Sequence, residues 1–125
     1  MSDLKDCVLV VDDEAIIAEL WCVYMEMMGL EICGRAATAD EAVALAELHR
    51  PALVLMDMRL QGRKDGVDAA LAINAGVGSK VIFITGSNEP DTLSRIQLDH
   101  PAAVLIKPIS HKQLHATVRQ ILPHL

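Results

Sequence analysis

The sequence predicts one α/β domain in which five parallel strands alternate with five helices. Apolar runs too short to be helices recur along the 125 residues, and longer segments with helical spacing of apolar side chains separate them. This alternation implies right-handed crossovers and a doubly wound sheet with helices on both faces. No linker, repeat or low-complexity tract divides the chain. We therefore expect a single domain over residues 1–125, with a core of about 7–122.

Composition and charge limit the function. The chain is 52% apolar but only 2% aromatic, and its net charge of −6 argues against direct nucleic-acid binding, which needs a basic face. The longest apolar stretch, Ala15 to Leu30, contains two glutamates and is shorter than the ~20 residues that span a bilayer. The polar first residues carry no secretory signal. We expect a cytoplasmic protein without membrane contact, whose three cysteines are small buried side chains.

The first strand is expected at Val8–Val11, and the first helix runs from near Glu14 to Gly29, a typical C-terminal cap. Two rows of apolar side chains are expected to face the core: Ile16, Leu20, Val23, Met27 and Ile17, Tyr24, Met28. Trp21, Cys22 and Met25 lie on another face of this helix. That face is either core or a partner surface.

The second strand is expected at Glu31–Ala36. Thr38 and Glu41 have the spacing of a capping box and begin a second helix that runs to about His49, before Pro51. The third strand is the apolar run that ends at Asp57, followed by a loop from Leu60 to Gly66. A helix capped by Asp65 is expected at 66–75, followed by a strand at 80–85 and a turn at 86–90. A helix with few apolar residues follows at 90–98, and then a strand at 103–106. The last helix begins with the capping box Ser110–Gln113 and stops at Pro123, and we expect it to bury Leu114, Val118 and Ile121.

Chemically useful residues follow four of these strands. Asp12 and Asp13 come after the first strand and Asp57 ends the third, while Thr85 and Lys107 end the fourth and fifth. The carboxyl ends of parallel strands meet at one edge of the sheet, where ligands bind in open α/β folds. We therefore expect three carboxylates, a hydroxyl and an ammonium to converge there.

This arrangement resembles the receiver domain of two-component response regulators, from Val8 to Ile121. The resemblance implies a flavodoxin-like (βα)5 fold with strand order 2-1-3-4-5. It implies that Asp57 accepts a phosphoryl group, that Lys107 and Thr85 bind this group, and that Mg²⁺ (or Mn²⁺) is held by four residues, namely Asp12, Asp13, Asp57 and the backbone carbonyl of Arg59. The stretch from Met56 to Gly66 is also similar to an alphaproteobacterial subgroup with a longer loop.

The resemblance further implies partners. A histidine kinase or histidine phosphotransfer protein would donate the phosphoryl group, and a homodimer would form through the fourth helix, fifth strand and fifth helix, or through the first helix. The protein would not be an enzyme, beyond at most slow removal of its own phosphoryl group. In many receivers an aromatic residue stands where this chain has Val104, and the subgroup's alternative aromatic position holds Ser87 and Asn88. Signalling would then rely on shifts between Thr85 and Leu98.

The residues themselves support a phosphoacceptor site. Phosphoryl transfer is catalysed mainly by positioning and electrostatics, and Mg²⁺ prefers hard oxygen ligands. Three clustered carboxylates would repel one another without a cation. Lys107 supplies a positive charge for phosphoryl oxygens, and Thr85 supplies a hydroxyl donor.

Each residue also has a plainer interpretation. Asp12 and Asp13 could cap the first helix, Lys107 could be an ordinary exposed lysine, and Thr85 could be an ordinary strand end. A pseudo-receiver that only binds proteins is one alternative function. An aspartate-nucleophile phosphatase is a second, but it needs an aspartate where Arg59 stands. A flavin binder is a third, but no phosphate loop follows the first strand.

Overall fold

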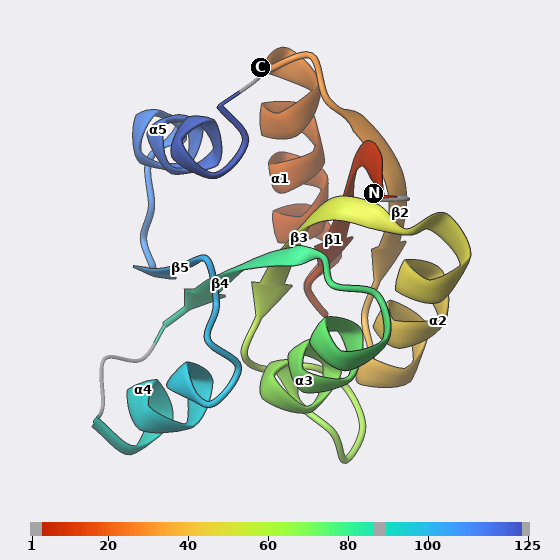
Figure 1. The fold of residues 1–125 in the computed structure, drawn as a ribbon. Helices are drawn as coiled ribbons and strands as arrows, with labels where there is room; N and C mark the ends of the chain where they lie inside the picture. Colours follow the sequence, from red (N-terminus) through yellow and green to blue (C-terminus); the bar gives the residue numbers. More distant parts are fainter. Residues whose placement is uncertain (1–3, 87–89, 124–125) are drawn as a thin grey trace.

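Five parallel strands form one sheet in the order β2-β1-β3-β4-β5, as predicted (Figure 1). The computed structural model describes residues 4–86 and 90–123. The strands are β1 (Lys5–Val11), β2 (Glu31–Ala36), β3 (Pro51–Asp57), β4 (Lys80–Thr85) and β5 (Ala103–Ile106). The helices are α1 (Ala15–Met27), α2 (Ala39–His49), α3 (Gly66–Gly76), α4 (Pro90–Gln97) and α5 (His111–Ile121).

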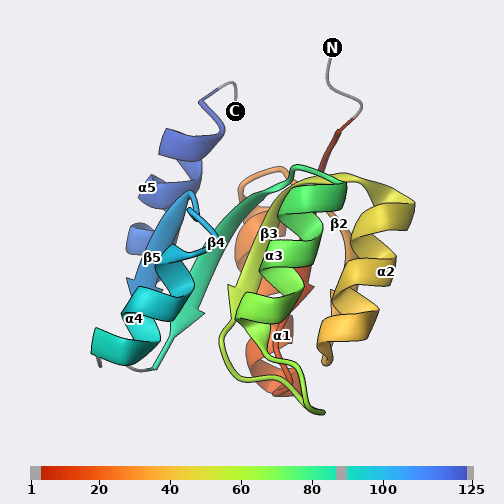
Figure 2. The ribbon, with the colours of Figure 1, turned by 60° about the horizontal axis from the view of Figure 1, so that its bottom comes forward.

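The helices cover both faces of the sheet. Helices α1 and α5 lie on one face, and α2, α3 and α4 lie on the other (Figures 1 and 2). Because side chains alternate along a strand, β1 sends Val8 and Val10 into the first layer and Leu9 and Val11 into the second. Every residue of β3 is buried, as expected for the central strand of a doubly wound sheet.

Capping side chains start the helices where the sequence predicts. The hydroxyl oxygen of Thr38 accepts a hydrogen bond from the Glu41 N–H at 3.1 Å, and that of Ser110 accepts one from the Gln113 N–H at 3.0 Å. Asp65 forms a complete capping box with Asp68. One detail differs, because the Glu41 carboxylate accepts from the N–H of Ala37 rather than from that of Thr38 itself.

Two strands begin earlier than predicted. Strand β1 starts at Lys5 rather than Val8, and β3 starts at Pro51, which we expected only to close the preceding helix. Arg50 explains the second difference, since its left-handed backbone (φ 49°) ends α2 in a single residue and leaves Pro51 free to enter the sheet. Gly29 likewise has a positive φ of 86° just past α1, which confirms its capping role.

The predicted inward face of α1 is partly wrong. The helix buries Ala18, Trp21, Cys22 and Met25, so the face that contains Trp21 is core rather than a partner surface. The row Ile16, Leu20, Val23 and Met27 points outward, with exposed fractions of 84, 38, 40 and 65%. The other predicted row, Ile17, Tyr24 and Met28, packs at the edge of the core. Apolar residues occur almost all round α1, so periodicity alone could not choose its buried face.

Helix α4 is the least anchored helix of the described chain, as its sparse apolar residues predict. Only Ile96 is buried on it, and Leu98 just beyond it is 64% exposed. The predicted turn at 86–90 includes residues 87–89, which lie outside the described residues, as do both alternative aromatic positions there. None of the helices within residues 4–86 and 90–123 is long and apolar enough to cross a membrane.

Candidate functional site

The residues that follow the strands meet in one cleft. It has a volume of about 900 Å³ and lies at the carboxyl edge of the sheet, where its lining includes Asp13, Asp57, Thr85 and Lys107. The loop between β3 and α3 forms another wall and projects past the ends of the strands (Figure 2). The convergence predicted from the strand ends is therefore present.

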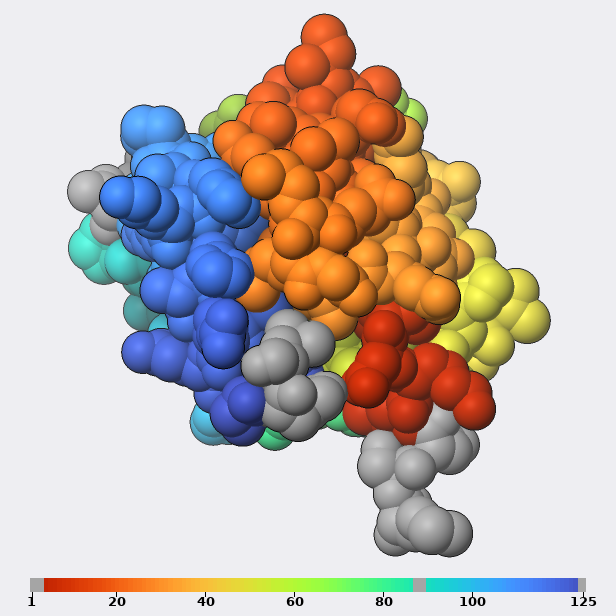
Figure 3. All heavy atoms as spheres, turned by 90° about the horizontal axis from the view of Figure 1, so that it is seen from above, coloured from red at the N-terminus to blue at the C-terminus, as the bar shows by residue number. Residues whose placement is uncertain are grey.

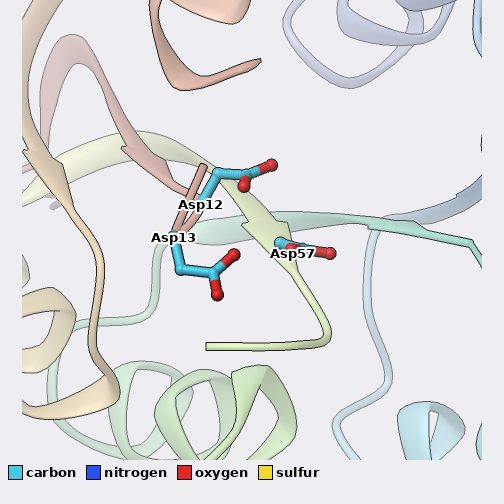
Figure 4. Close-up of side chains that lie close together, drawn as sticks. All are labelled: Asp12, Asp13 and Asp57. Carbon is cyan, nitrogen blue, oxygen red and sulfur yellow. The ribbon is translucent and has the colours of Figure 1, made fainter. Parts of the chain in front are cut away.

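Three carboxylates form the acidic centre of this cleft (Figure 4). Oxygen atoms of Asp12, Asp13 and Asp57 all lie within 4.8 Å of one another. Asp12 follows β1 directly and is 3% exposed, and Asp57 ends β3 and is 7% exposed. Carboxylates this close and this buried repel one another unless a cation lies between them.

Asp12 uses its two oxygens differently. Its Oδ1 accepts a hydrogen bond from the Glu14 N–H at 2.9 Å, just ahead of α1. This oxygen therefore fixes the backbone of Glu14, the N-cap residue of α1, but no side-chain hydrogen bond caps the helix itself. Its Oδ2 is buried and has no hydrogen-bond partner among the described residues. An orphaned carboxylate oxygen beside two further carboxylates fits a hard divalent cation such as Mg²⁺.

Lys107 points into the acidic centre. Its Nζ lies 3.5 Å from Asp57 Oδ1 and 3.7 Å from Asp12 Oδ2. The backbone helps to place it, because the Lys107 N–H donates to the Thr85 carbonyl oxygen at 2.7 Å. Thr85 is itself buried, and it lines the cleft. The ammonium, the hydroxyl-bearing residue and the carboxylates thus belong to one site.

The electrostatics of the site act chiefly on Asp57. Burial raises the pKa of its carboxyl to about 6, and the neighbouring Asp12 charge adds to this rise. The Lys107 ammonium and a hydrogen bond from the backbone of Arg59 oppose the shift. Both raising causes disfavour the charged carboxylate, so a cation bound at the cluster would favour the form that can attack phosphorus.

The loop between β3 and α3 is fixed at several points. The Gly66 N–H donates to the Met58 carbonyl oxygen at 2.8 Å and closes the loop at its base. The Gln61 N–H donates to the Ala37 carbonyl oxygen at 3.1 Å and so joins the loop to the end of β2. Near the tip, Lys64 Nζ lies 3.2 Å from Asp40 Oδ1. These contacts make the loop a formed wall of the cleft.

Sequence reasoning missed the contact between this wall and α4. The guanidinium of Arg95 forms an ion pair with Asp65 and a second one, at 3.3 Å, with Asp68. Thr92, one turn earlier on α4, lines the cleft. Arg95 is 30 and 27 residues from its partners, and no local pattern signals a pair at that separation.

The fold and the site together define a doubly wound α/β domain with an acidic, lysine-containing pocket at the carboxyl edge of its sheet. A profile described as "Response regulator receiver domain" matches residues 8–119. The chain therefore belongs to the receiver-domain family of response regulators.

Individual relatives agree with this membership. The chain is 37% identical over 107 residues to the transcriptional regulatory protein PdtaR of Mycobacterium tuberculosis, a match that covers 86% of this chain and 52% of PdtaR. It is 31% identical over 122 residues to the phyllosphere-induced regulator PhyR of Methylorubrum extorquens, covering 97% of this chain and 45% of PhyR. The chain thus spans about half the length of these relatives.

Solved structures of receiver domains have the same fold as this chain. The signal receiver domain of a modulated diguanylate cyclase from Desulfovibrio desulfuricans G20 superposes with a TM-score of 0.88 at 32% identity, over 98% of this chain and 96% of that one. The PhyR receiver domain of Erythrobacter litoralis superposes with a TM-score of 0.83 at 29% identity, over 95% and 91% of the two chains. The resemblance inferred from the strand-end residues is confirmed.

Proposed function

We propose that this domain accepts a phosphoryl group on Asp57 and changes its partner binding in response. The observation that carries the proposal is the position of Lys107 Nζ, 3.5 Å from Asp57 Oδ1, beside three carboxylates whose oxygens lie within 4.8 Å of one another. The Lys107 ammonium, together with a divalent cation held by the carboxylates, would neutralise the negative charge of an incoming phosphoryl group. We infer that the single domain extends over residues 1–125 of this sequence, and that it is cytoplasmic and not an enzyme in its own right.

Each site residue has a distinct role in this proposal. Asp57 Oδ attacks phosphorus, the ammonium of Lys107 binds a phosphoryl oxygen, and the hydroxyl of Thr85 donates to another. Asp12, Asp13, Asp57 and the backbone carbonyl of Arg59 would hold Mg²⁺ or Mn²⁺, which supplies Lewis-acid stabilisation of the transferring group. Asp12 Oδ2, which lacks a hydrogen-bond partner among the described residues, supports this assignment.

A direct experiment tests the phosphoacceptor. The protein is incubated with acetyl phosphate and Mg²⁺, and its intact mass is measured. We expect one added phosphoryl group in the wild-type protein and none in Asp57→Asn. A wild-type protein that gains no phosphoryl group would instead support a pseudo-receiver. Rapid release of inorganic phosphate, well above the slow self-dephosphorylation expected of a receiver, would support the phosphatase alternative.

The phosphodonor is proposed to be a histidine kinase or histidine phosphotransfer protein that docks on α1. The outward row Ile16, Leu20, Val23 and Met27 forms an apolar stripe along this helix, which we call the α1 stripe. It begins at Ile16, two residues after Glu14, which lines the cleft, so the stripe starts near the site. Viewed onto this face, α1 lies at the surface beside α5 (Figure 3). An amphipathic helix that carries the donor histidine fits such a stripe.

A homodimer stays a prediction. It would form through α4, β5 and α5, where Leu98 and Ile106 are 64 and 38% exposed, or through α1. Sedimentation velocity with and without beryllofluoride, a phosphoryl mimic, tests both. A shift from monomer to dimer that Ile106→Gln abolishes would favour the first surface, and an unchanged monomer would exclude both.

A further inference from the structure

The wall of the cleft carries cations that the phosphoacceptor chemistry does not use. Four basic residues line the cleft: Arg59, Arg63, Lys64 and Lys107. Lys107 is held by Asp12 and Asp57, and Lys64 is paired with Asp40. Within residues 4–86 and 90–123, the guanidinium groups of Arg59 and Arg63 form no ion pair with an acidic side chain. Both residues are exposed.

The cleft is also larger than a phosphoryl group requires. Its volume of about 900 Å³ extends from Asp57 to Gly62 and Arg63 on the loop, and to Thr92 on α4. The attacking and leaving oxygens lie roughly in line across phosphorus, so the leaving group faces away from Asp57 and outward. Space and positive charge that is not paired with an acidic side chain of residues 4–86 or 90–123 therefore occur together on the outer side of the cleft.

The loop places the backbone of Arg63 beside the cleft before any donor arrives. Residues 58–66 are closed by the Gly66–Met58 hydrogen bond and joined to β2 by the Gln61–Ala37 hydrogen bond. Arg63 lies between Gln61 and Lys64, both of which have a partner outside the loop. The planar guanidinium of Arg63 can bind a carboxylate through two parallel hydrogen bonds, and the bonded loop limits the backbone freedom lost when it does so.

We propose that Arg63 selects small acyl phosphates as donors by stabilising their carboxylate leaving group. This inference rests on the proposed function of Asp57. In the step, an Asp57 oxygen forms a bond to phosphorus while the bond between phosphorus and the acyl oxygen breaks. The electron pair of the broken bond stays on the acyl oxygen, which leaves as a carboxylate, and no proton is transferred. The leaving group is a neutral imidazole when phosphohistidine is the donor and ammonia when phosphoramidate is the donor. Arg63 therefore gives these donors no such advantage.

The test compares two donors on the full chain with Mg²⁺ present. Rates of Asp57 phosphorylation by acetyl phosphate and by phosphoramidate are measured by intact mass for the wild type, Arg63→Gln and Arg63→Lys. We expect the ratio of the two rates, acetyl phosphate over phosphoramidate, to fall about threefold to tenfold in Arg63→Gln. Arg63→Lys keeps the positive charge but cannot form two parallel hydrogen bonds to a carboxylate, so it should give an intermediate ratio. Lys80→Gln removes the same charge at the opposite edge of the sheet and should leave the ratio unchanged.

A second readout does not depend on transfer. Acetylphosphonate, which keeps the acyl group but cannot donate, should inhibit phosphorylation by phosphoramidate more weakly in Arg63→Gln than in the wild type. An unchanged ratio, or equal slowing with both donors, would overturn the role of Arg63 while leaving Asp57 as the acceptor. A wild-type protein that accepts from neither donor would overturn the proposed function, and this inference with it.

Discussion

Gly66, the first residue of α3, packs against the end of β3, the strand that carries Asp57. A Cβ atom at this position would lie 2.1 Å from the backbone oxygen of Asp57 and 3.0 Å from its carbonyl carbon. Neither is the end of a flexible side chain, so the strand end itself would have to move. Gly66 is therefore needed for its small size, at the very residue whose side chain must be positioned.

Gly66→Ala should weaken both the fold and the site. We expect a loss of about 1–3 kcal/mol in the free energy of unfolding, measured in urea, because overpacking displaces backbone. We also expect slower phosphorylation by acetyl phosphate. Gly76→Ala is the matched control, since a Cβ there meets nothing within 4 Å. If Gly66→Ala matches this control in both measurements, the close approach does not matter.

Asp99 is a buried carboxyl that the site does not use. It is 2% exposed, and its Oδ1 has no hydrogen-bond partner among the described residues. Burial raises its pKa from 3.8 to about 6, against the opposing effect of His100. Lys80 and His100 are the other titratable groups that line the adjacent cavity of about 110 Å³.

Asp99→Asn should stabilise the protein at neutral pH. The folded state holds the Asp99 proton more tightly than the unfolded state, so this residue's contribution to stability falls as pH rises from about 4 to about 6 and stays low above that. The variant lacks this fall, so its free energy of unfolding should exceed that of the wild type by about 1–3 kcal/mol at pH 7.5 and differ little from it at pH 4. Urea unfolding across this range checks it, with exposed Glu31→Gln as control. A gain that is the same at both pH values would contradict the titration argument.

At the scale of elements, the α1 stripe allows the proposed docking of the donor to be tested separately from the chemistry at Asp57. Leu20→Gln combined with Val23→Gln removes apolar contacts from the middle of the stripe without disturbing buried residues such as Trp21. We expect phosphotransfer from a purified cognate histidine kinase to slow about tenfold or more, while the rate with acetyl phosphate stays unchanged. The exposed Leu48 on α2, changed to Gln, is the control. Equal slowing with both donors would reject docking on α1.

The ion pairs of Arg95 tie α4 to the start of α3. These side chains are partly exposed, with Arg95 at 42% and its partners Asp65 and Asp68 at 30 and 40%, so we expect a contribution of only about 0.5–1 kcal/mol. Arg95→Gln should therefore raise amide exchange across 90–97 by about twofold to fivefold. Lys112→Gln on α5 is the control.

The same measurement tests how the signal spreads. Without an aromatic residue at Val104, we expect beryllofluoride with Mg²⁺ to change amide protection between Thr85 and Leu98. In Arg95→Gln this change should be larger, because α4 is held less firmly. Unchanged protection in both proteins would count against signalling through α4.

At the scale of the whole molecule, we expect the acidic centre to make stability depend on divalent cations. Mg²⁺ at about ten times its dissociation constant should stabilise the wild-type protein by about 1.4 kcal/mol in urea unfolding. Asp13→Asn removes one proposed ligand and should reduce this gain. In EDTA the same variant should be more stable than the wild type, since it relieves repulsion among Asp12, Asp13 and Asp57. A variant destabilised in EDTA would show that Asp13 has a structural role instead.

Much of this architecture can be predicted from the sequence, because the residues that follow the predicted strands indicate which strand ends lie at the same edge of the sheet. The five apolar runs, the caps at Thr38, Asp65 and Ser110, and the convergence of Asp57 with Lys107 all follow from local patterns. What could not be predicted depends on packing between distant segments. The buried face of α1 and the pairing of Arg95 with Asp65 are decided by how helices lie against the sheet and against one another.

The single tryptophan of the chain is a built-in optical probe of this packing. Trp21 is 5% exposed and lies in the layer between α1 and the sheet, with the Tyr24 ring at 6.1 Å. Its emission should move to longer wavelength only when water enters that layer. Tryptophan fluorescence can therefore follow global unfolding of every variant above. We expect the emission wavelength to stay unchanged when a ligand or partner only binds at the surface.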